Sequence, residues 1–177
     1  MLYRMDIRKI NRLVRKPISS NYIEDCIHGV NFVPYSDIKH MNHIDELLGP
    51  NNMCVMIYLL GSDVGHFVCM YKRNNKLYYS NSYGIEPDDD LRLVPKAVRH
   101  SLNENIPYLF KLIVESGLPC DYNEYKLQGK NTSTCGRHCI VRLRNKHLDA
   151  EQYAKALYNL SKNSGYTIDQ IVTMATV

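Results

Sequence analysis

Apolar residues recur at helical spacing near the start of the chain. In segment 7–16, Ile10, Leu13 and Val14 fall on one side and most charged residues on the other, which predicts a short amphipathic helix. Segment 19–27, "SSNYIEDCI", opens with serines and has a glutamate close behind, a pattern typical of a capped helix start. We therefore expect two short helices before the first strand.

The pattern changes to continuous apolar runs in the middle of the chain. Segments 53–60 and 66–71 are almost wholly apolar, as buried strands are. The turn sequence "RNNK" follows, and then a third strand-like segment, 77–82, "LYYSNS". These three segments predict an antiparallel meander.

Helical spacing returns after the meander. It predicts helices over 88–105 (kinked near Pro95), 106–116, 135–147, 149–163 and 167–175, with a strand over 121–128. Helices at both ends of a small sheet indicate an α+β fold, with a small central mixed or antiparallel sheet flanked by helices. The length of 177 residues suits a single domain spanning 1–177.

Composition narrows the class of protein only slightly. The chain is 45% hydrophobic and 23% charged, with a net charge of +4, so an anionic partner is permitted without being required. Its start is charged throughout, unlike a secretory leader, and the longest apolar run is too short to span a bilayer. We therefore expect no membrane partner, a reducing compartment, and free thiols in place of disulfides.

The segment 127–139, "LQGKNTSTCGRHC", holds two cysteines, a histidine and two glycines within thirteen residues. A helix is expected to begin at Cys135, where backbone N–H groups and the helix dipole favour a thiolate. Gly136 is expected to let a substrate backbone approach closely. Zinc is disfavoured because no second Cys or His pair is present, and a bridge to Cys139 is disfavoured because the two side chains would run nearly parallel. We expect Cys139 to be a buried apolar residue, together with Cys54 and Cys69.

A nucleophilic cysteine needs a base and usually a third group that orients the base. His138 lies one helical turn after Cys135, and His66 begins an apolar strand. Asn81 ends the next strand and is a candidate orienting group for His66, although "SNSYG" is also an ordinary turn sequence. Spacing alone leaves the choice of base open.

The order of these residues resembles that of the adenovirus-type maturation cysteine proteases (adenain-like) and, more distantly, of the SUMO-specific proteases of the same fold. The matching elements, in chain order, are His66, Asn81, Tyr83 with Gly84, Gln128, and Cys135 with Gly136. The match extends over roughly residues 55–145.

The resemblance implies a papain-like or adenain-like fold and a cysteine endopeptidase. Cys135 would be the nucleophile, His66 the base and Asn81 the residue that sets the tautomer of His66. Gln128 would donate to the oxyanion beside the backbone N–H of Cys135. The family has an acidic residue where this chain has Asn81, and an amide cannot stabilise an imidazolium by charge. The helix end and the thiolate would then have to stabilise the ion pair alone.

The resemblance also implies a substrate and a setting. Viral structural (capsid) precursors would be cleaved after a small residue, most often glycine, during virion maturation. This would occur in the virion or in the cytoplasm or nucleus of the host of a small double-stranded DNA virus or virus-like element. The alternatives are a SUMO- or ubiquitin-like-specific protease and a catalytically silent binding module.

No cofactor is required by this chemistry, but stimulation by DNA or by a short viral peptide is expected from the resemblance. The sequence offers basic residues that suit non-specific DNA binding, and an ordinary solvated face explains them equally well. They are Arg8, Arg12, Arg15, Lys16, Arg142, Arg144 and Lys146.

Overall fold

A mixed five-stranded sheet forms the centre of the computed structural model, which describes residues 6–61 and 64–177. Its strands lie in chain order: β1 (Asn31–Pro34), β2 (Met53–Leu59), β3 (Gly65–Arg73), β4 (Lys76–Ser80) and β5 (Cys120–Tyr122). The three central strands are antiparallel, which confirms the predicted meander, and each outer strand runs parallel to its neighbour. Together with its helices, the sheet makes the expected α+β fold.

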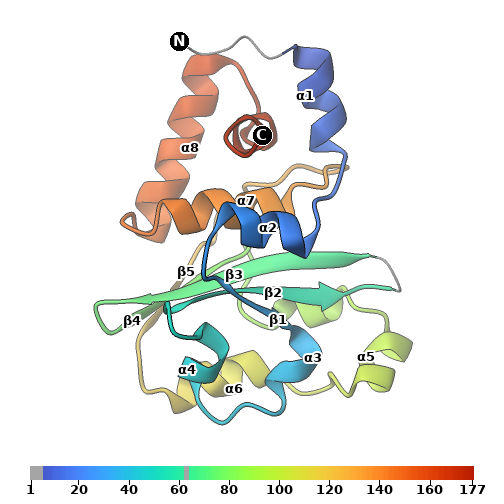
Figure 1. The fold of residues 1–177 in the computed structure, drawn as a ribbon, viewed down its shortest axis with the longest axis vertical. Helices are drawn as coiled ribbons and strands as arrows, with labels where there is room; N and C mark the ends of the chain where they lie inside the picture. The colour runs from blue at the N-terminus through green and yellow to red at the C-terminus, as the bar shows by residue number, and fades with distance from the viewer. Residues whose placement is uncertain (1–5, 62–63) are drawn as a thin grey trace.

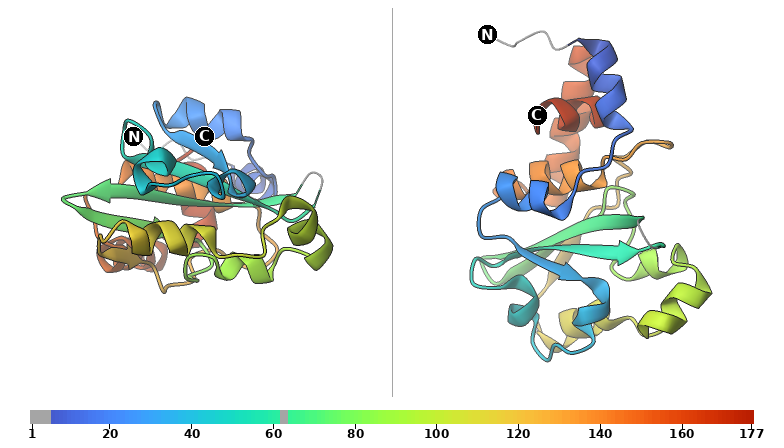
Figure 2. Two further views of the ribbon diagram at one scale, coloured as in Figure 1. Left: turned by 90° about the horizontal axis from the view of Figure 1, so that it is seen from below. Right: turned by 45° about the vertical axis from the view of Figure 1, so that its right-hand side comes forward.

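Helices cover both faces of this sheet (Figures 1 and 2). On one face lie α3 (Tyr35–Ile38), α4 (Ile44–Leu48), α5 (Lys96–Leu102) and α6 (Tyr108–Glu115). On the other lie α2 (Ser20–Cys26) and α7 (Cys135–Arg144), and beyond them α1 (Ile7–Val14), α8 (Ala150–Ser164) and α9 (Ile168–Met174). Within the described residues, no helix combines the length and the apolarity that crossing a membrane requires.

The continuous apolar run of β3 follows from this layered arrangement. Side chains of a strand alternate between the two faces of the sheet. Val68 and Met70 enter the core beneath α3, α4 and α6, whereas Phe67, Cys69 and Tyr71 enter the core beneath α2 and α7. Because both faces are covered, apolar residues are needed at successive positions.

Two predicted elements differ from the structure. The segment 88–105 is not one helix: a 3-10 turn (η1, Asp89–Arg92) is followed by α5, for which Pro95 is the N-cap. Proline lacks an N–H and disfavours helical geometry in the residue before it, so the chain starts a new helix there. The strand predicted over 121–128 ends at Tyr122.

The basic face predicted for α7 is wrong for Arg142. This side chain is only 2% exposed and lies over the rings of Tyr71 and Tyr153. Its guanidinium donates to the carbonyls of Asn145 and Leu148. Arg142 therefore stabilises the packing of α7 and cannot contact DNA.

A tight turn after β4 depends on Gly84. The N–H of Gly84 donates to the carbonyl of Asn81, and its φ of +71° lies in the left-handed region. A Cβ at this position would lie 2.6 Å from the backbone carbon of Tyr125. Gly117 has a similar φ of +64° but open space around it.

These two glycines separate backbone strain from steric clash. We expect Gly117→Ala to lower the free energy of unfolding by about 1 kcal/mol through strain alone. Gly84→Ala should lower it by about 3 kcal/mol, because the clash with backbone adds to the strain. Urea unfolding of both variants measures the difference, and equal losses would show that the contact with Tyr125 is unimportant.

Candidate active site

Cys135 is the first residue of α7, as the sequence predicted, and it lines a surface pocket. Burial by itself would raise the pKa of its thiol. The hydrogen bond and charge of His66, together with the backbone N–H groups of Phe67 and Gly136, instead lower this pKa below its ordinary value. Cys135 is thus favoured as a thiolate.

The remaining cysteines have no such environment. Burial raises the pKa of Cys120 to about 11 and raises the pKa values of Cys54 and Cys139 further. Cys54, Cys69 and Cys139 are buried, as predicted, and all six cysteines are free thiols. Within the described residues, no cluster of three or more His, Cys, Asp or Glu could hold a metal.

His66 lies on β3 and contacts Cys135 with its imidazole ring. Its Nε2 lies 3.0 Å from Oδ1 of Asn81, which leaves Nδ1 for the thiol. The ring of Tyr83 stacks on it at 4.5 Å and 16°. Burial would lower the pKa of His66, but the hydrogen bond to Cys135 and the charges of Cys135 and Asp90 raise it above its ordinary value. Both shifts favour an imidazolium–thiolate pair.

Asn81 follows β4 directly and is completely buried behind His66. The side chain of Asn123 brackets its backbone, accepting from its N–H at 2.9 Å and donating to its carbonyl at 2.7 Å. Its own Oδ1 also accepts from the backbone N–H of Tyr83 at 2.9 Å. Asn81 is therefore rigidly placed, and it orients His66 from the side opposite the pocket.

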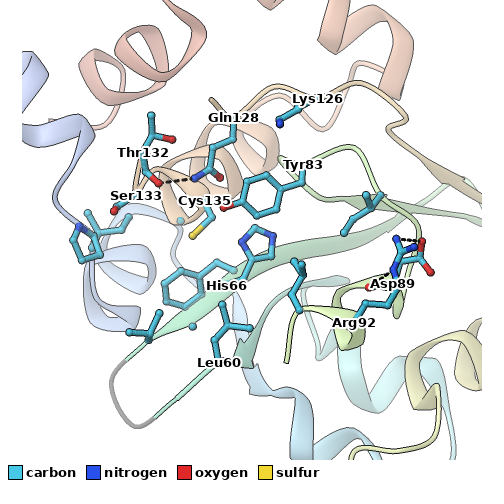
Figure 3. A pocket seen from close by; sticks show the side chains of 18 residues that line it. Leu60, His66, Tyr83, Asp89, Arg92, Lys126, Gln128, Thr132, Ser133 and Cys135 are labelled. Atoms are coloured by element: carbon cyan, nitrogen blue, oxygen red, sulfur yellow. Dashed lines mark hydrogen bonds and ion pairs between the residues drawn. The ribbon is translucent and has the colours of Figure 1, made fainter. Parts of the chain in front are cut away.

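Gln128 lies across the pocket from His66 (Figure 3). Its Oε1 accepts from the hydroxyl of Ser82 at 2.6 Å, and its Nε2 donates to the carbonyl of Thr132 at 3.1 Å. These contacts fix the orientation of the amide. A side-chain amide has two N–H groups, so one remains for a ligand beside Cys135.

The pocket that joins these groups has a volume of about 860 Å³. His66, Gln128 and Cys135 line it, with Cys135 between the other two in Figure 3, and apolar side chains form much of the rest of its wall. These wall residues include Ile18, Leu60, Phe67, Ile85 and Leu93. An open pocket of this kind can accept an extended peptide with its carbonyl near the thiol.

Gly136 is constrained by packing as well as by its place at the pocket. A Cβ at this position would lie 2.8 Å from Cγ1 of Ile18 and 3.2 Å from Cδ1 of Ile23. The glycine is therefore required by the packing of α7 against α2 and the segment before it. Gly136 also lines the pocket beside Cys135, so the expectation that it leaves room for a substrate stays a prediction.

Asp169, on α9, is a functional residue that the sequence did not reveal. Its carboxylate accepts from the backbone N–H of Gly129 at 2.8 Å and from the hydroxyl of Thr134. Burial would raise its pKa, but hydrogen bonds from His138, Thr134 and Gly129 lower it. Asp169 thus clamps both ends of the loop between Gln128 and Cys135.

His138, the rival base, belongs to this clamp. Its Nε2 lies 3.3 Å from Oδ1 of Asp169, and it does not line the pocket. Asp90 is a second residue that the sequence did not reveal: its Oδ2 accepts from Nδ2 of Asn81 at 2.7 Å. The structure therefore brings together His66, Asn81, Gln128 and Cys135 and separates His138 from them.

A cysteine at a helix start, a histidine and an orienting amide form the constellation that thiol hydrolases use. The chain is 35% identical over 148 residues to the uncharacterized protein V9 of Sputnik virophage, which covers 82% of this chain and 85% of that protein. The chain belongs to the family of this virophage protein, as expected for a protein of a virus-like element. No protein-family model matches it.

Solved structures that are similar to the chain include two of the SUMO protease Ulp1. One is the C-terminal Ulp1 protease domain in complex with Smt3, the yeast orthologue of SUMO, at 12% identity and a TM-score of 0.39, covering 97% of this chain and 82% of that domain. The other is the SUMO protease Ulp1 with its catalytic cysteine oxidised to a sulfinic acid, at 13% identity and a TM-score of 0.38, covering 97% and 84%. The likeness concerns the fold, and the chemistry of the site rests on the contacts given above.

The pKa shifts of the pair predict selective alkylation. Because the pKa of Cys135 is lowered and that of His66 raised, the ion pair persists between these two values, and thiolate is present below the pH where ordinary thiols react. Iodoacetamide near pH 7 should modify Cys135 at least about tenfold faster than any other cysteine. Peptide mass spectrometry over time measures the rates.

Unfolding the protein in guanidinium should abolish this selectivity, since the site is then lost. Faster modification of Cys139 or Cys120 in the native protein would contradict the assignment.

Proposed function

We propose that the protein is a cysteine endopeptidase. The observation that carries the proposal is the set of contacts from Asn81 through His66 to Cys135, with Gln128 lining the same open pocket. A structural cysteine would need neither a lowered pKa nor a histidine oriented by a buried amide.

The proposed reaction follows from the positions of these groups. The Cys135 thiolate attacks the peptide carbonyl carbon, and the oxyanion accepts hydrogen bonds from Gln128 and from the backbone N–H of Cys135. The imidazolium of His66 gives its proton to the leaving amine as the C–N bond breaks. Water, deprotonated by His66, then attacks the thioester and releases the acid and the free thiol.

We further propose that the substrates are virus-encoded structural precursors, cleaved after a small residue such as glycine during virion maturation. The family resemblance and the virophage relative support this choice. The rings of Tyr83 and Phe67 flank the catalytic groups, and a residue without a large side chain lets the scissile carbonyl approach the thiol to roughly 3–3.5 Å.

Substitution of the two histidines tests the proposal directly. We expect His66→Ala and Cys135→Ala to reduce cleavage of capsid precursors from the same genome by at least about a thousandfold, because each removes a reacting group. His138→Ala should retain activity within about tenfold, since His138 contacts Asp169 and not the thiol. Gel analysis and mass spectrometry of the products give the rates and the cleavage sites.

SUMO and ubiquitin fusions form the second substrate set in the same assay. Discrete cleavage of precursors with intact fusions supports the maturation protease. Efficient cleavage of fusions with intact precursors would favour a ubiquitin-like-specific protease. An alkylatable Cys135 without cleavage of either set would favour a binding module.

DNA is proposed as a stimulating partner, with a short viral peptide as the other candidate. Four basic side chains on and after α1 are exposed to solvent: Arg8, Arg12, Arg15 and Lys16. Exposed cations in one short segment suit contact with phosphates and carry no sequence preference.

DNA binding, if it occurs through this segment, should depend steeply on salt. Four phosphate contacts predict a slope of about −4 in a plot of log affinity against log salt concentration. Arg8→Gln/Arg12→Gln/Arg15→Gln should reduce this slope by about 3, whereas Lys111→Gln/Lys155→Gln, on α6 and α8, should leave it unchanged. Fluorescence anisotropy measures both, and no binding at low salt would exclude DNA.

A further inference from the structure

A buried carboxylate lies directly behind Asn81. Asp90, in η1, is 0% exposed, and its Oδ2 accepts from Nδ2 of Asn81 at 2.7 Å and from the hydroxyl of Tyr79 at 3.1 Å. Its Oδ1 lies 3.7 Å from Nε2 of His66 and has no hydrogen-bond partner within the described part of the chain. A buried, unpaired oxygen of this kind calls for an explanation.

We propose that Asp90 is a positioning residue of the active site, which fixes the orientation of the Asn81 amide and supplies the negative charge that Asn81 lacks. The inference rests on the proposed cysteine protease chemistry. Asn81, which contacts His66, is neutral, and the negative charge lies behind it on the carboxylate of Asp90.

The orientation of the amide follows from the chemistry of the carboxylate. An ionised carboxylate only accepts hydrogen bonds, so the amide nitrogen of Asn81 must face Asp90 and its oxygen must face His66. An amide oxygen in turn only accepts, so Nε2 of His66 must carry a proton. In the neutral imidazole Nδ1 is then unprotonated and can take the proton of Cys135.

Opposing effects act on the pKa of the Asp90 carboxyl. Burial raises its pKa, whereas His66 and hydrogen bonds from Asn81 and Tyr79 act in the opposite direction, with a net rise. Every neighbour of its two oxygens named above is a donor: the Asn81 amide and the Tyr79 hydroxyl at Oδ2, and the Nε2–H of His66 near Oδ1. The amide nitrogen of Asn81 and the Nε2–H of His66 cannot accept a hydrogen bond from a protonated Asp90, so these donors offset part of the effect of burial and favour the carboxylate.

The charge of Asp90 acts mainly on His66. At 3.7 Å and with both side chains buried, the interaction is only weakly screened by salt. The titratable groups around Asp90 and His66 are Cys135, Tyr58, Tyr79, Tyr83, Asp88 and Asp89, and within this described set His66 is the one group that can carry a positive charge. Asp90 therefore stabilises the imidazolium, and through it the thiolate of Cys135.

Removing this charge should narrow the pH range in which the ion pair exists. A carboxylate near an imidazolium raises the pKa of the imidazolium, and the imidazolium lowers the pKa of the thiol. In a plot of cleavage rate against pH, the rise on the acid side reflects loss of the Cys135 proton, and the fall on the alkaline side reflects loss of the His66 proton. In Asp90→Asn the rise should move to higher pH and the fall to lower pH. The rise and the fall belong to the coupled pair and are read as macroscopic values.

The test measures alkylation of Cys135 by iodoacetamide from pH 4 to 10, together with peptide cleavage, in four variants. Asp90→Asn should raise the half-maximal pH of alkylation by about one unit, which is about tenfold less thiolate on the acid side of the profile. Asn81→Asp should also be slower than wild type, because two carboxylates then face each other at the distance of a hydrogen bond. Asn81→Asp/Asp90→Asn restores one carboxylate and one amide in exchanged positions, and should recover most of the wild-type profile.

Asp88→Asn is the matched control. Asp88 is also a buried aspartate of this loop, but it accepts from the hydroxyl of Tyr58 and the N–H of Phe110. Its loss should lower the melting temperature and leave the alkylation profile in place. A profile unchanged in Asp90→Asn, or shifted equally in Asp88→Asn, would overturn the proposal.

A measurement on the wild-type protein needs no variant to fold. NMR of ¹⁵N-labelled histidine should find the neutral side chain of His66 protonated at Nε2, and protonation at Nδ1 would overturn the proposed orientation. Neither this readout nor alkylation requires a substrate. Suppose that His66 is protonated at Nε2 and that the alkylation profile shifts in Asp90→Asn as predicted, but that the wild-type protein cleaves no peptide. The protease assignment then fails while the role of Asp90 stands.

Discussion

The hydrogen bond between Asn81 and His66 is the contact on which the site depends. It joins β3 to the residue that directly follows β4, so the antiparallel register of the two strands sets its geometry. Because Oδ1 of Asn81 accepts, His66 is left with Nδ1 toward Cys135. Donors and acceptors then alternate from Asp90 through Asn81 and His66 to the thiol. In the proposed arrangement, Asp90 sets the orientation of the Asn81 amide, and Asn81 sets the tautomer of His66.

The rest of the fold keeps these groups in place from two directions. On one side, Asn123 brackets the backbone of Asn81. On the opposite side of the pocket, Asp169 clamps the loop between Gln128 and Cys135. Each anchor is buried and hydrogen-bonded, so Asn81, Gln128 and Cys135 are fixed in place without a bound ligand, as the proposed chemistry requires.

The sequence predicted what depends on local pattern and chain order, and it missed what depends on contacts between distant segments. Apolar runs predicted β2, β3 and β4, and the periodicity after "KNTST" predicted that α7 begins at Cys135. The adjacent aspartates 88–90 look alike in sequence, yet they bind Tyr58, Arg92 and Asn81 respectively. Asp169 resembles an ordinary acidic residue in the first turn of a helix. Only the folded chain distinguishes such residues.

The central claim is that Cys135 attacks a carbonyl whose oxygen is received by Gln128. A crystal structure of the protein with a peptide aldehyde ending in glycinal tests it most directly. We expect a hemithioacetal on Sγ of Cys135, with its oxygen roughly 2.7–3.1 Å from Nε2 of Gln128 and from the backbone N of Cys135. An adduct on another cysteine, or an unmodified Cys135 with the aldehyde bound elsewhere, would contradict the account.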